Sequence, residues 1–226
     1  MSDFPYQALT FDCFGTLINW RRGQKESLSA LPELHGLDEH LPELHAVRME
    51  EEQRMQAGPW RPYSEILADS LRLASHRLLR IELSAGSCHA FSQAQAHWPA
   101  FPDSADALQR LAKRCTIGLL SNCDAAPLRF AATETLGLES PVLVPSEAIR
   151  SYKPAAEHWN AALRLLNYSP DKVLHVSAYG FYDLIPASHL GFDVAFIARD
   201  SETPPAKLKL AYQAHDLADL ADQLGC

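Results

Sequence analysis

An aspartate followed by a glycine–threonine turn lies near the start of the chain and could do covalent chemistry. The segment 8–17 runs from strand-forming residues into Asp12 and then through Gly15 and Thr16. The carboxyl end of a parallel strand opens onto the crevice in which open α/β sheets bind ligands. An aspartate at that point could be a nucleophile that forms an ester or an aspartyl phosphate. The simpler alternative is a carboxylate that caps the turn or the helix expected near Ile18.

Polar side chains also follow three later segments. They are Ser121 and Asn122 after 116–120, Lys153 between Tyr152 and Pro154, and Asp183 in the loop 177–183. A parallel sheet brings the carboxyl ends of its strands together, so we expect these groups to meet Asp12 at one edge. A lysine beside Asp12 would keep the carboxylate ionised, and Ser121 with nearby backbone N–H groups could hold an anionic oxygen. Taken singly, Ser121 would be a helix cap and Lys153 a surface residue.

The elements that must position these groups alternate between strand and helix after residue 98. Apolar runs predict strands, besides the one ending at Asp12, at 116–120, 141–144, 172–176 and 193–197. Helical periodicity predicts helices at 103–113, 127–136, 155–166, 182–190 and 217–224. Strands spaced by helices imply right-handed crossovers and a parallel sheet covered on both faces. We therefore expect an α/β fold with a Rossmann-like sheet.

The stretch 22–97 has helical periodicity, is rich in Leu, Ala, Glu and Arg, and contains no convincing strand. Prolines cut it into about four helices, the clearest at 44–57 and 64–79. Because this block is inserted after the first strand, it should lie over the carboxyl edge of the sheet. We expect a Rossmann-like core domain of residues 1–18 and 99–226 and a helical cap domain of residues 19–98.

Composition narrows the possible partners and surroundings. The net charge of −8 and the pI near 5.6 argue against nucleic acid or an anionic membrane as a partner. The first residues do not resemble a secretion signal, and no apolar run is long enough to span a membrane. Five cysteines without CxxC spacing suggest neither zinc nor a disulfide framework. We expect a reduced, cytoplasmic protein.

The order and spacing of the four polar segments resemble those of the haloacid dehalogenase (HAD) superfamily of hydrolases over essentially the whole core. The phosphatases of that superfamily carry a second Asp two residues after the nucleophile, where this chain has Phe14. Their last loop reads G-D-S-x-x-x-D and helps to hold Mg²⁺, whereas here Ala178 replaces the first acid and only Asp183 remains. Both departures weigh against a magnesium-dependent phosphatase.

The run from Asp12 to Leu17 is similar to the Asp-x-aromatic-Gly-Thr-Leu opening of the 2-haloacid dehalogenases, the branch that works without a metal. This resemblance implies that Asp12 displaces halide from C2 of a short 2-haloalkanoate with inversion and forms an ester. Water then attacks the carboxyl carbon of Asp12 and releases the 2-hydroxy acid. The implied partners are a small carboxylate substrate and halide, with no cofactor. A homodimer is possible by the same resemblance.

The resemblance also assigns roles to individual residues. Those that match positions holding the nucleophile, the substrate carboxylate and water are Thr16, Ser121, Lys153, Ser177 and Asp183. Asn122 matches an asparagine that lines the halide side with a cap arginine, for which Arg48 is the best candidate and Arg54 and Arg61 are rivals. The remaining residues expected to contact substrate are Cys13, Phe14, Trp159 and Tyr179. Tyr179 stands where these dehalogenases commonly have Asn, in a loop that is one residue longer.

Two other functions stay open on the sequence alone. One is a HAD phosphatase with an altered magnesium site that uses Asp12, the carbonyl of Phe14 and Asp183. The other is a scaffold or ligand-binding protein without turnover. His175 lies inside the strand 172–176 and is expected to be a buried residue with satisfied hydrogen bonds.

Overall fold

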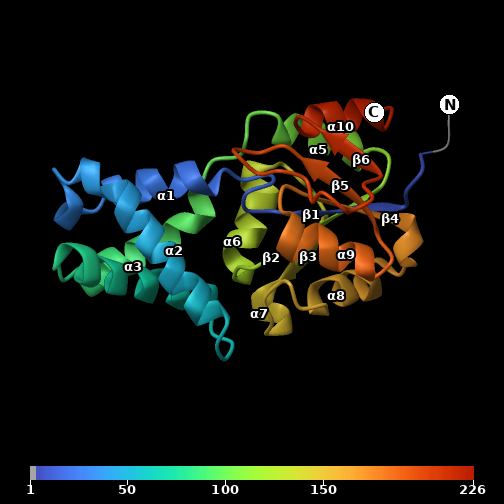
Figure 1. Ribbon diagram of the computed structural model, residues 1–226. Coiled ribbons are helices and arrows are strands. Elements are labelled where there is room, and N and C mark those ends of the chain that lie inside the picture. Colours follow the sequence, from blue (N-terminus) through green and yellow to red (C-terminus); the bar gives the residue numbers. More distant parts are fainter. Residues whose placement is uncertain (1–3) are drawn as a thin grey trace.

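The computed structural model describes residues 4–226, which form a sheet-containing core and a lobe made only of helices (Figure 1). Residues 1–3 lie outside the described part of the chain. They belong to the expected core segment 1–18 and to the stretch that was compared with a secretion signal. Within residues 4–226, no helix is both long enough and apolar enough to cross a membrane.

The core is a six-stranded parallel sheet with the order β3-β2-β1-β4-β5-β6. Its strands are β1 (Ala8–Asp12), β2 (Thr116–Ser121), β3 (Val142–Pro145), β4 (Val173–Ser177), β5 (Asp193–Ile197) and β6 (Tyr212–Ala214). The α/β fold and its first five strands confirm the prediction. The sequence analysis missed β6, because three residues that pair only with the edge of β5 are too short to show a strand pattern.

Alternate residues of β1 face opposite sides of the sheet. Leu9 and Phe11 belong to the cluster formed with helices α5 (Ser104–Ala112) and α10 (Leu217–Gln223). Ala8 belongs to a second cluster, on the side of α8 (Glu157–Leu166). The other core helices are α6 (Ala125–Phe130), α7 (Ser146–Ile149) and α9 (Ile185–His189), with the π-helical turns η4 (Ala131–Thr135) and η6 (Gly180–Leu184) and the 3₁₀ turn η5 (Pro170–Lys172). The layers therefore match the predicted doubly covered sheet.

The helical lobe leaves the core after β1 and returns before α5. Its helices are α1 (Trp20–Ser29), α2 (Leu41–Gln56), α3 (Tyr63–Leu79) and α4 (Ala85–Gln93), with the 3₁₀ turns η1 (Pro32–Leu34), η2 (Asp38–His40) and η3 (Ala94–His97). The outgoing and returning chains pair, because Phe101 N donates to Leu17 O over 3.0 Å and Asn19 N donates to Pro99 O over 2.7 Å. We call this lobe the cap.

The cap touches the core at points away from these two connections. The Asp124 carboxylate, in the loop after β2, accepts hydrogen bonds from Tyr63 N and Ser64 N at 2.8 and 2.9 Å. It thereby satisfies two free N–H groups at the start of α3. On the other side, Arg21 of α1 pairs with Asp200 at 2.8 Å. The loop that follows β2 is therefore tied directly to a cap helix.

Candidate active site

Asp12 lies at the carboxyl end of β1, where the chain turns sharply. The carbonyl of Cys13 accepts from Leu17 N and Ile18 N, and Gly15 has a φ of 109° in this turn. A side chain at Gly15 would collide with the ring of Tyr179, whose hydroxyl would be 2.1 Å from an added Cβ. Only glycine fits both the backbone and the contact. The turn aims Asp12 out of the sheet edge.

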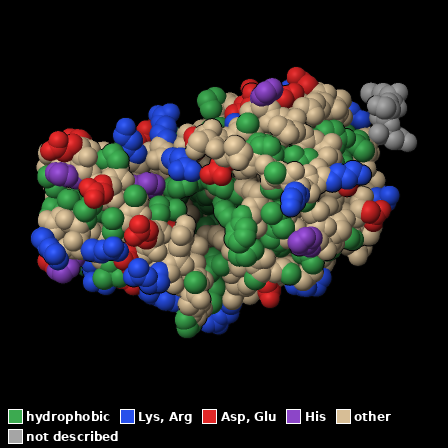
Figure 2. All heavy atoms as spheres, viewed as in Figure 1, with side chains coloured by type: hydrophobic (Ala, Val, Ile, Leu, Met, Phe, Trp, Pro, Cys, Tyr) green, Lys and Arg blue, Asp and Glu red, His purple; other side chains and the backbone are tan. Residues whose placement is uncertain are grey.

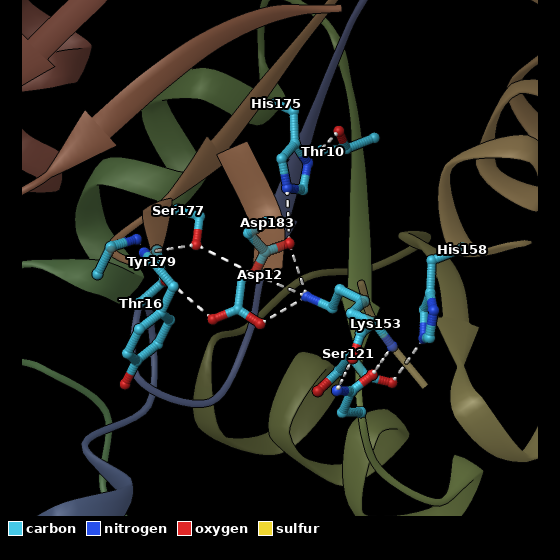
Figure 3. A network of polar contacts seen from close by, with 12 residues as sticks. Thr10, Asp12, Thr16, Ser121, Lys153, His158, His175, Ser177, Tyr179 and Asp183 are labelled. Carbon is cyan, nitrogen blue, oxygen red and sulfur yellow. Dashed lines mark hydrogen bonds and ion pairs between the residues drawn. The ribbon is translucent and has the colours of Figure 1, made fainter. Parts of the chain in front are cut away.

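Both carboxylate oxygens of Asp12 accept hydrogen bonds. Thr16 Oγ1 donates to Oδ2 over 2.9 Å and is itself fixed by the N–H of Ala178 at 3.0 Å. Lys153 Nζ donates to Oδ1 over 2.8 Å (Figure 3). Asp12 is only 3% exposed. The two donors fix the orientation of a carboxylate that is almost completely withdrawn from solvent.

Lys153 joins Asp12 to Asp183. Its ammonium group also donates to both oxygens of Asp183, at 2.9 and 3.0 Å, and the side chains of Lys153 and Asp183 are wholly buried. Ser177 Oγ donates to Asp183 over 3.1 Å and accepts from Tyr179 N over 3.0 Å. Residues from three separate segments, 12–16, 153 and 177–183, thus converge at one sheet edge.

Burial and charge act in opposite directions on these three groups. Burial, together with the nearby Asp183, raises the pKa of Asp12 to about 6 despite the opposing effects of Lys153 and Thr16. Burial also favours neutral Asp183, but the charge of Lys153 and a hydrogen bond from His175 hold the pKa of Asp183 below its usual value. The two carboxylates outweigh burial at Lys153 and raise its pKa, so the ammonium stays charged.

Ser121 and Asn122 end β2 beside this cluster. The Asn122 side chain brackets the backbone of Lys153, accepting from Lys153 N at 2.7 Å and donating to Lys153 O at 3.3 Å. His158 Nε2 donates to the Ser121 carbonyl over 3.2 Å, and Ser121 is 2% exposed. Asn122 therefore holds Lys153 in place, in addition to any contact it makes with a ligand.

Aromatic side chains lie on the cap side of Asp12. The hydroxyl of Tyr179 accepts from Trp20 Nε1 over 2.7 Å, and its ring stacks on Tyr182 at 4.9 Å. Phe14 is half-buried and meets the edge of Trp98 at 5.8 Å. In the space-filling view a hollow separates the cap from the core, with hydrophobic side chains gathered along it (Figure 2). Such a lining excludes water and strengthens electrostatic contacts.

Five of the candidate residues make no hydrogen bond to Asp12 in the described part of the chain. Arg48 is fully buried within the cap, where it donates to Glu52 and to Gln24, and its rivals Arg54 and Arg61 also pair with cap carboxylates. Trp159 is fully buried beneath the sheet, against His175. Cys13 is fully buried, and burial raises the pKa of its thiol. The structure brings none of these side chains into hydrogen-bond contact with Asp12 among the described residues.

Two contributors to the site were missed in the sequence. Arg199, just after β5, donates through Nε to the carbonyl of Thr16 over 2.9 Å and pairs with Asp103 through both terminal nitrogens. His45, from cap helix α2, packs on the Trp20 ring at 5.6 Å. Burial lowers the pKa of His45 to about 4, so it is neutral near pH 7. The position of Arg199 after a predicted strand was a usable signal, whereas nothing in the sequence distinguished His45 from the nine other histidines.

The side chains around Asp183 do not suit a magnesium ion. Mg²⁺ needs near-octahedral oxygen ligands, usually one or two carboxylates plus water and substrate oxygens. Four protein hydrogen bonds occupy the oxygens of Asp183, two of them from the Lys153 ammonium. The position of the second acid is the buried Ala178. Lys153 supplies the positive charge between the two carboxylates.

A parallel sheet with a buried Asp–Lys–Asp cluster at its carboxyl edge and a helical cap inserted after β1 defines the class of HAD-fold hydrolases. Residues 6–178 match the family model described as haloacid dehalogenase-like hydrolase, and the chain belongs to that family. The family confirms the resemblance drawn from the sequence.

Individual relatives are more distant. The chain is 25% identical over 150 residues to an (S)-2-haloacid dehalogenase of Pseudomonas fluorescens. The match covers 66% of this chain and 65% of that protein, so it spans just under two thirds of the length of this relative. It is 27% identical over 207 residues to an (S)-2-haloacid dehalogenase of Xanthobacter autotrophicus, covering 89% of this chain and 78% of that protein.

Solved structures share the fold closely. An L-2-haloacid dehalogenase at 26% identity superposes with a TM-score of 0.82 over 97% of this chain and 99% of that one. A putative HAD hydrolase from Bacillus subtilis bound to magnesium, at 14% identity, superposes with a TM-score of 0.81 over 98% and 99%. Because both superpose equally well, the fold does not select the reaction, and the side chains of the site must do so.

Proposed function

We propose that the chain hydrolyses a short 2-haloalkanoic acid to the 2-hydroxy acid, without a metal ion, through an ester on Asp12. The observation that carries this proposal is the Lys153 ammonium bound between Asp12 and Asp183, together with Phe14 and Ala178 at the positions of the phosphatase acids. The relatives named as 2-haloacid dehalogenases support the substrate class.

In the first step, a carboxylate oxygen of Asp12 attacks C2 of the substrate and the carbon–halogen bond breaks. The electron pair of that bond leaves with the halide, and a neutral ester remains. Lys153 and Thr16 orient Asp12 for attack. Ser121 and the backbone N–H groups after β2 are our candidates for holding the substrate carboxylate. The aromatic lining by Tyr179, together with Phe14, excludes competing water.

In the second step, a water oxygen adds to the carboxyl carbon of the Asp12 ester. We propose that Asp183 accepts the proton that this water gives up, and that one of the four hydrogen bonds to Asp183 breaks so that the water can take its place. Lys153 offsets the negative charge of the tetrahedral intermediate. Collapse breaks the bond between that carbon and the oxygen attached to C2, so the product keeps an oxygen of Asp12. The departing oxygen takes the proton back from Asp183, and Asp12, re-formed as the acid, releases its own proton. One halide and one proton leave per turnover.

A direct test compares two reactions. The purified protein should release halide and 2-hydroxy acid in equal amounts from a 2-halopropionate, with inversion, and EDTA should not reduce the rate. Phosphate release from p-nitrophenyl phosphate should be absent with or without Mg²⁺. Magnesium-dependent phosphate release without halide release would establish the phosphatase alternative. Neither reaction, over a panel of halides and chain lengths, would favour a binding protein.

The pH dependence follows from the burial of Asp12. The nucleophile must be ionised, and its raised pKa of about 6 lies within the working range. We therefore expect kcat/KM to be constant above that pKa and to fall about tenfold per pH unit below it. A pH–rate profile with a halopropionate measures this, since the substrate carboxyl stays ionised there. A profile that is flat down to the ordinary pKa of an aspartate would contradict the proposed environment of Asp12.

A further inference from the structure

Two polar side chains lie beneath the active-site carboxylates, inside the sheet. Thr10 and His175 are both completely buried and are register partners on the neighbouring strands β1 and β4. Register partners in a parallel pair point to the same face. Thr10 Oγ1 lies 3.0 Å from Nδ1 of His175 (Figure 3). A histidine in the middle of a buried strand therefore has a hydrogen-bonding partner on the adjacent strand.

The other nitrogen of His175 reaches the active site. Its Nε2 lies 3.0 Å from Oδ1 of Asp183, the same oxygen that accepts from Lys153. The contacts form a continuous buried chain from Thr10 through His175, Asp183 and Lys153 to Asp12. The expectation of a satisfied buried histidine was correct, but its partner is a residue of the candidate active site.

The surroundings fix which nitrogen carries the proton. Burial lowers the pKa of His175, despite the hydrogen bond to Asp183, so the ring is neutral. An ionised Asp183 can only accept, so Nε2 carries the hydrogen and Nδ1 must accept from the hydroxyl of Thr10. On the opposite side of Thr10, a Cβ added at Gly118 would lie 3.1 Å from its Cγ2 methyl. The absent side chain at Gly118 gives that methyl room, which leaves the hydroxyl turned toward His175.

We propose that Asp183 and Thr10 together hold the His175 ring in its Nε2–H form, and that His175 acts as a positioning residue that fixes Asp183 and, through it, Lys153 at the nucleophile. The proposal deepens the proposed function and rests on it for its catalytic consequence. His175 itself does not contact substrate. The rings of Trp159 and Phe192 pack against it at 5.7 and 6.4 Å and keep water away.

The geometry can be tested without any substrate. Nitrogen NMR of protein labelled with ¹⁵N-histidine, with His175 assigned through His175→Gln, reports which ring nitrogen is protonated. We expect a protonated Nε2 and a bare Nδ1 at about pH 8, above the ordinary pKa of a histidine. Thr10→Ser should keep this pattern. Thr10→Val, which has the same shape without the hydroxyl, should keep Nε2 protonated but move the Nδ1 resonance, because that nitrogen loses its hydrogen-bond donor. A protonated Nδ1 in the wild type, or an unchanged spectrum in Thr10→Val, would overturn the proposal whether or not the protein turns over haloacids.

The catalytic consequence separates positioning from packing. His175→Leu removes the donor to Asp183 and should lower kcat about tenfold or more with little change in KM. The kcat of this variant should also begin to fall at a higher pH than that of the wild type, because Asp183 must be ionised to accept a proton from water and the lost hydrogen bond no longer holds down its pKa. The charged or titratable groups facing His175 are Asp183, Lys153 and His158. His175→Gln places an N–H near the same point and should restore both properties. Equal losses in the two variants, with wild-type pH profiles, would show a purely structural role.

Discussion

Asp12→Asn is expected to reduce haloacid turnover by at least about 10⁴-fold, since removing a covalent nucleophile leaves only binding and electrostatic contributions. The amide has nearly the same shape as the carboxylate, and Lys153 retains Asp183 as its charge partner. Thermal unfolding of the variant should therefore stay close to that of the wild type. Halide release in single-turnover and steady-state assays measures the effect.

The matched control is Asp38→Asn, which makes the same chemical change at an exposed residue of the cap. It should leave both turnover and unfolding unchanged. An Asp12→Asn variant that retains turnover within about tenfold of the wild type would remove Asp12 from the mechanism. A tenfold loss corresponds to only about 1.4 kcal/mol of activation free energy, which is too little for a lost nucleophile.

Lys153→Met should be nearly as damaging, for an electrostatic reason. Without the ammonium, two buried carboxylates face each other, and the pKa of Asp12 rises further because Lys153 no longer lowers it. We expect kcat to fall by about 10²- to 10³-fold. The acid limb of the pH–rate profile should also move to higher pH. The two changes are measured together in a pH–rate series.

Lys153→Met also leaves Asp183 buried without its cation, and such a loss costs about 3 to 5 kcal/mol of stability. Lys153→Arg keeps the charge but replaces a compact ammonium with a planar group, so it should fold and remain poorly active. Lys172→Met, at an exposed lysine, is the control for the loss of one charge. A well-folded Lys153→Met protein with wild-type kcat and an unmoved acid limb would contradict the role assigned to Lys153.

The grouping of the polar residues that follow the strands could be predicted from the topology of the sheet. Apolar strands separated by helices require a parallel sheet, and such a sheet gathers its carboxyl ends at one edge. That rule was enough to place Asp12, Lys153 and Asp183 near one another. It gave no information on which atoms touch, and so it did not show that Asn122 brackets the Lys153 backbone.

The orientation of the cap side chains could not be predicted as well as the positions of the residues at the strand ends. Helical periodicity located α2 and α3 within a few residues, but sequence distance from Asp12 does not say which face of α2 turns toward the core. Arg48 packs inside the cap against Glu52, while His45 lies beside Trp20. The tie between Asp124 and α3 likewise joins segments about sixty residues apart.

The partnership of Thr10 and His175 was hidden for a different reason. It depends on the register between β1 and β4, which are distant in sequence but adjacent in the sheet. A shift of one residue in that register would turn the two side chains to opposite faces. No local pattern in either strand specifies this alignment.

The most direct measurement of the central claim is the fate of water oxygen during turnover. After a haloacid is turned over in ¹⁸O-water and the protein is digested in ordinary water, the tryptic peptide 1–21 carries only two side-chain carboxyls, Asp3 and Asp12. The ester mechanism predicts ¹⁸O in Asp12, located by fragmentation, and an unlabelled hydroxyl in the product of the first turnover. Label in that first product with none in the peptide would show direct attack by water on the substrate and contradict the covalent role of Asp12.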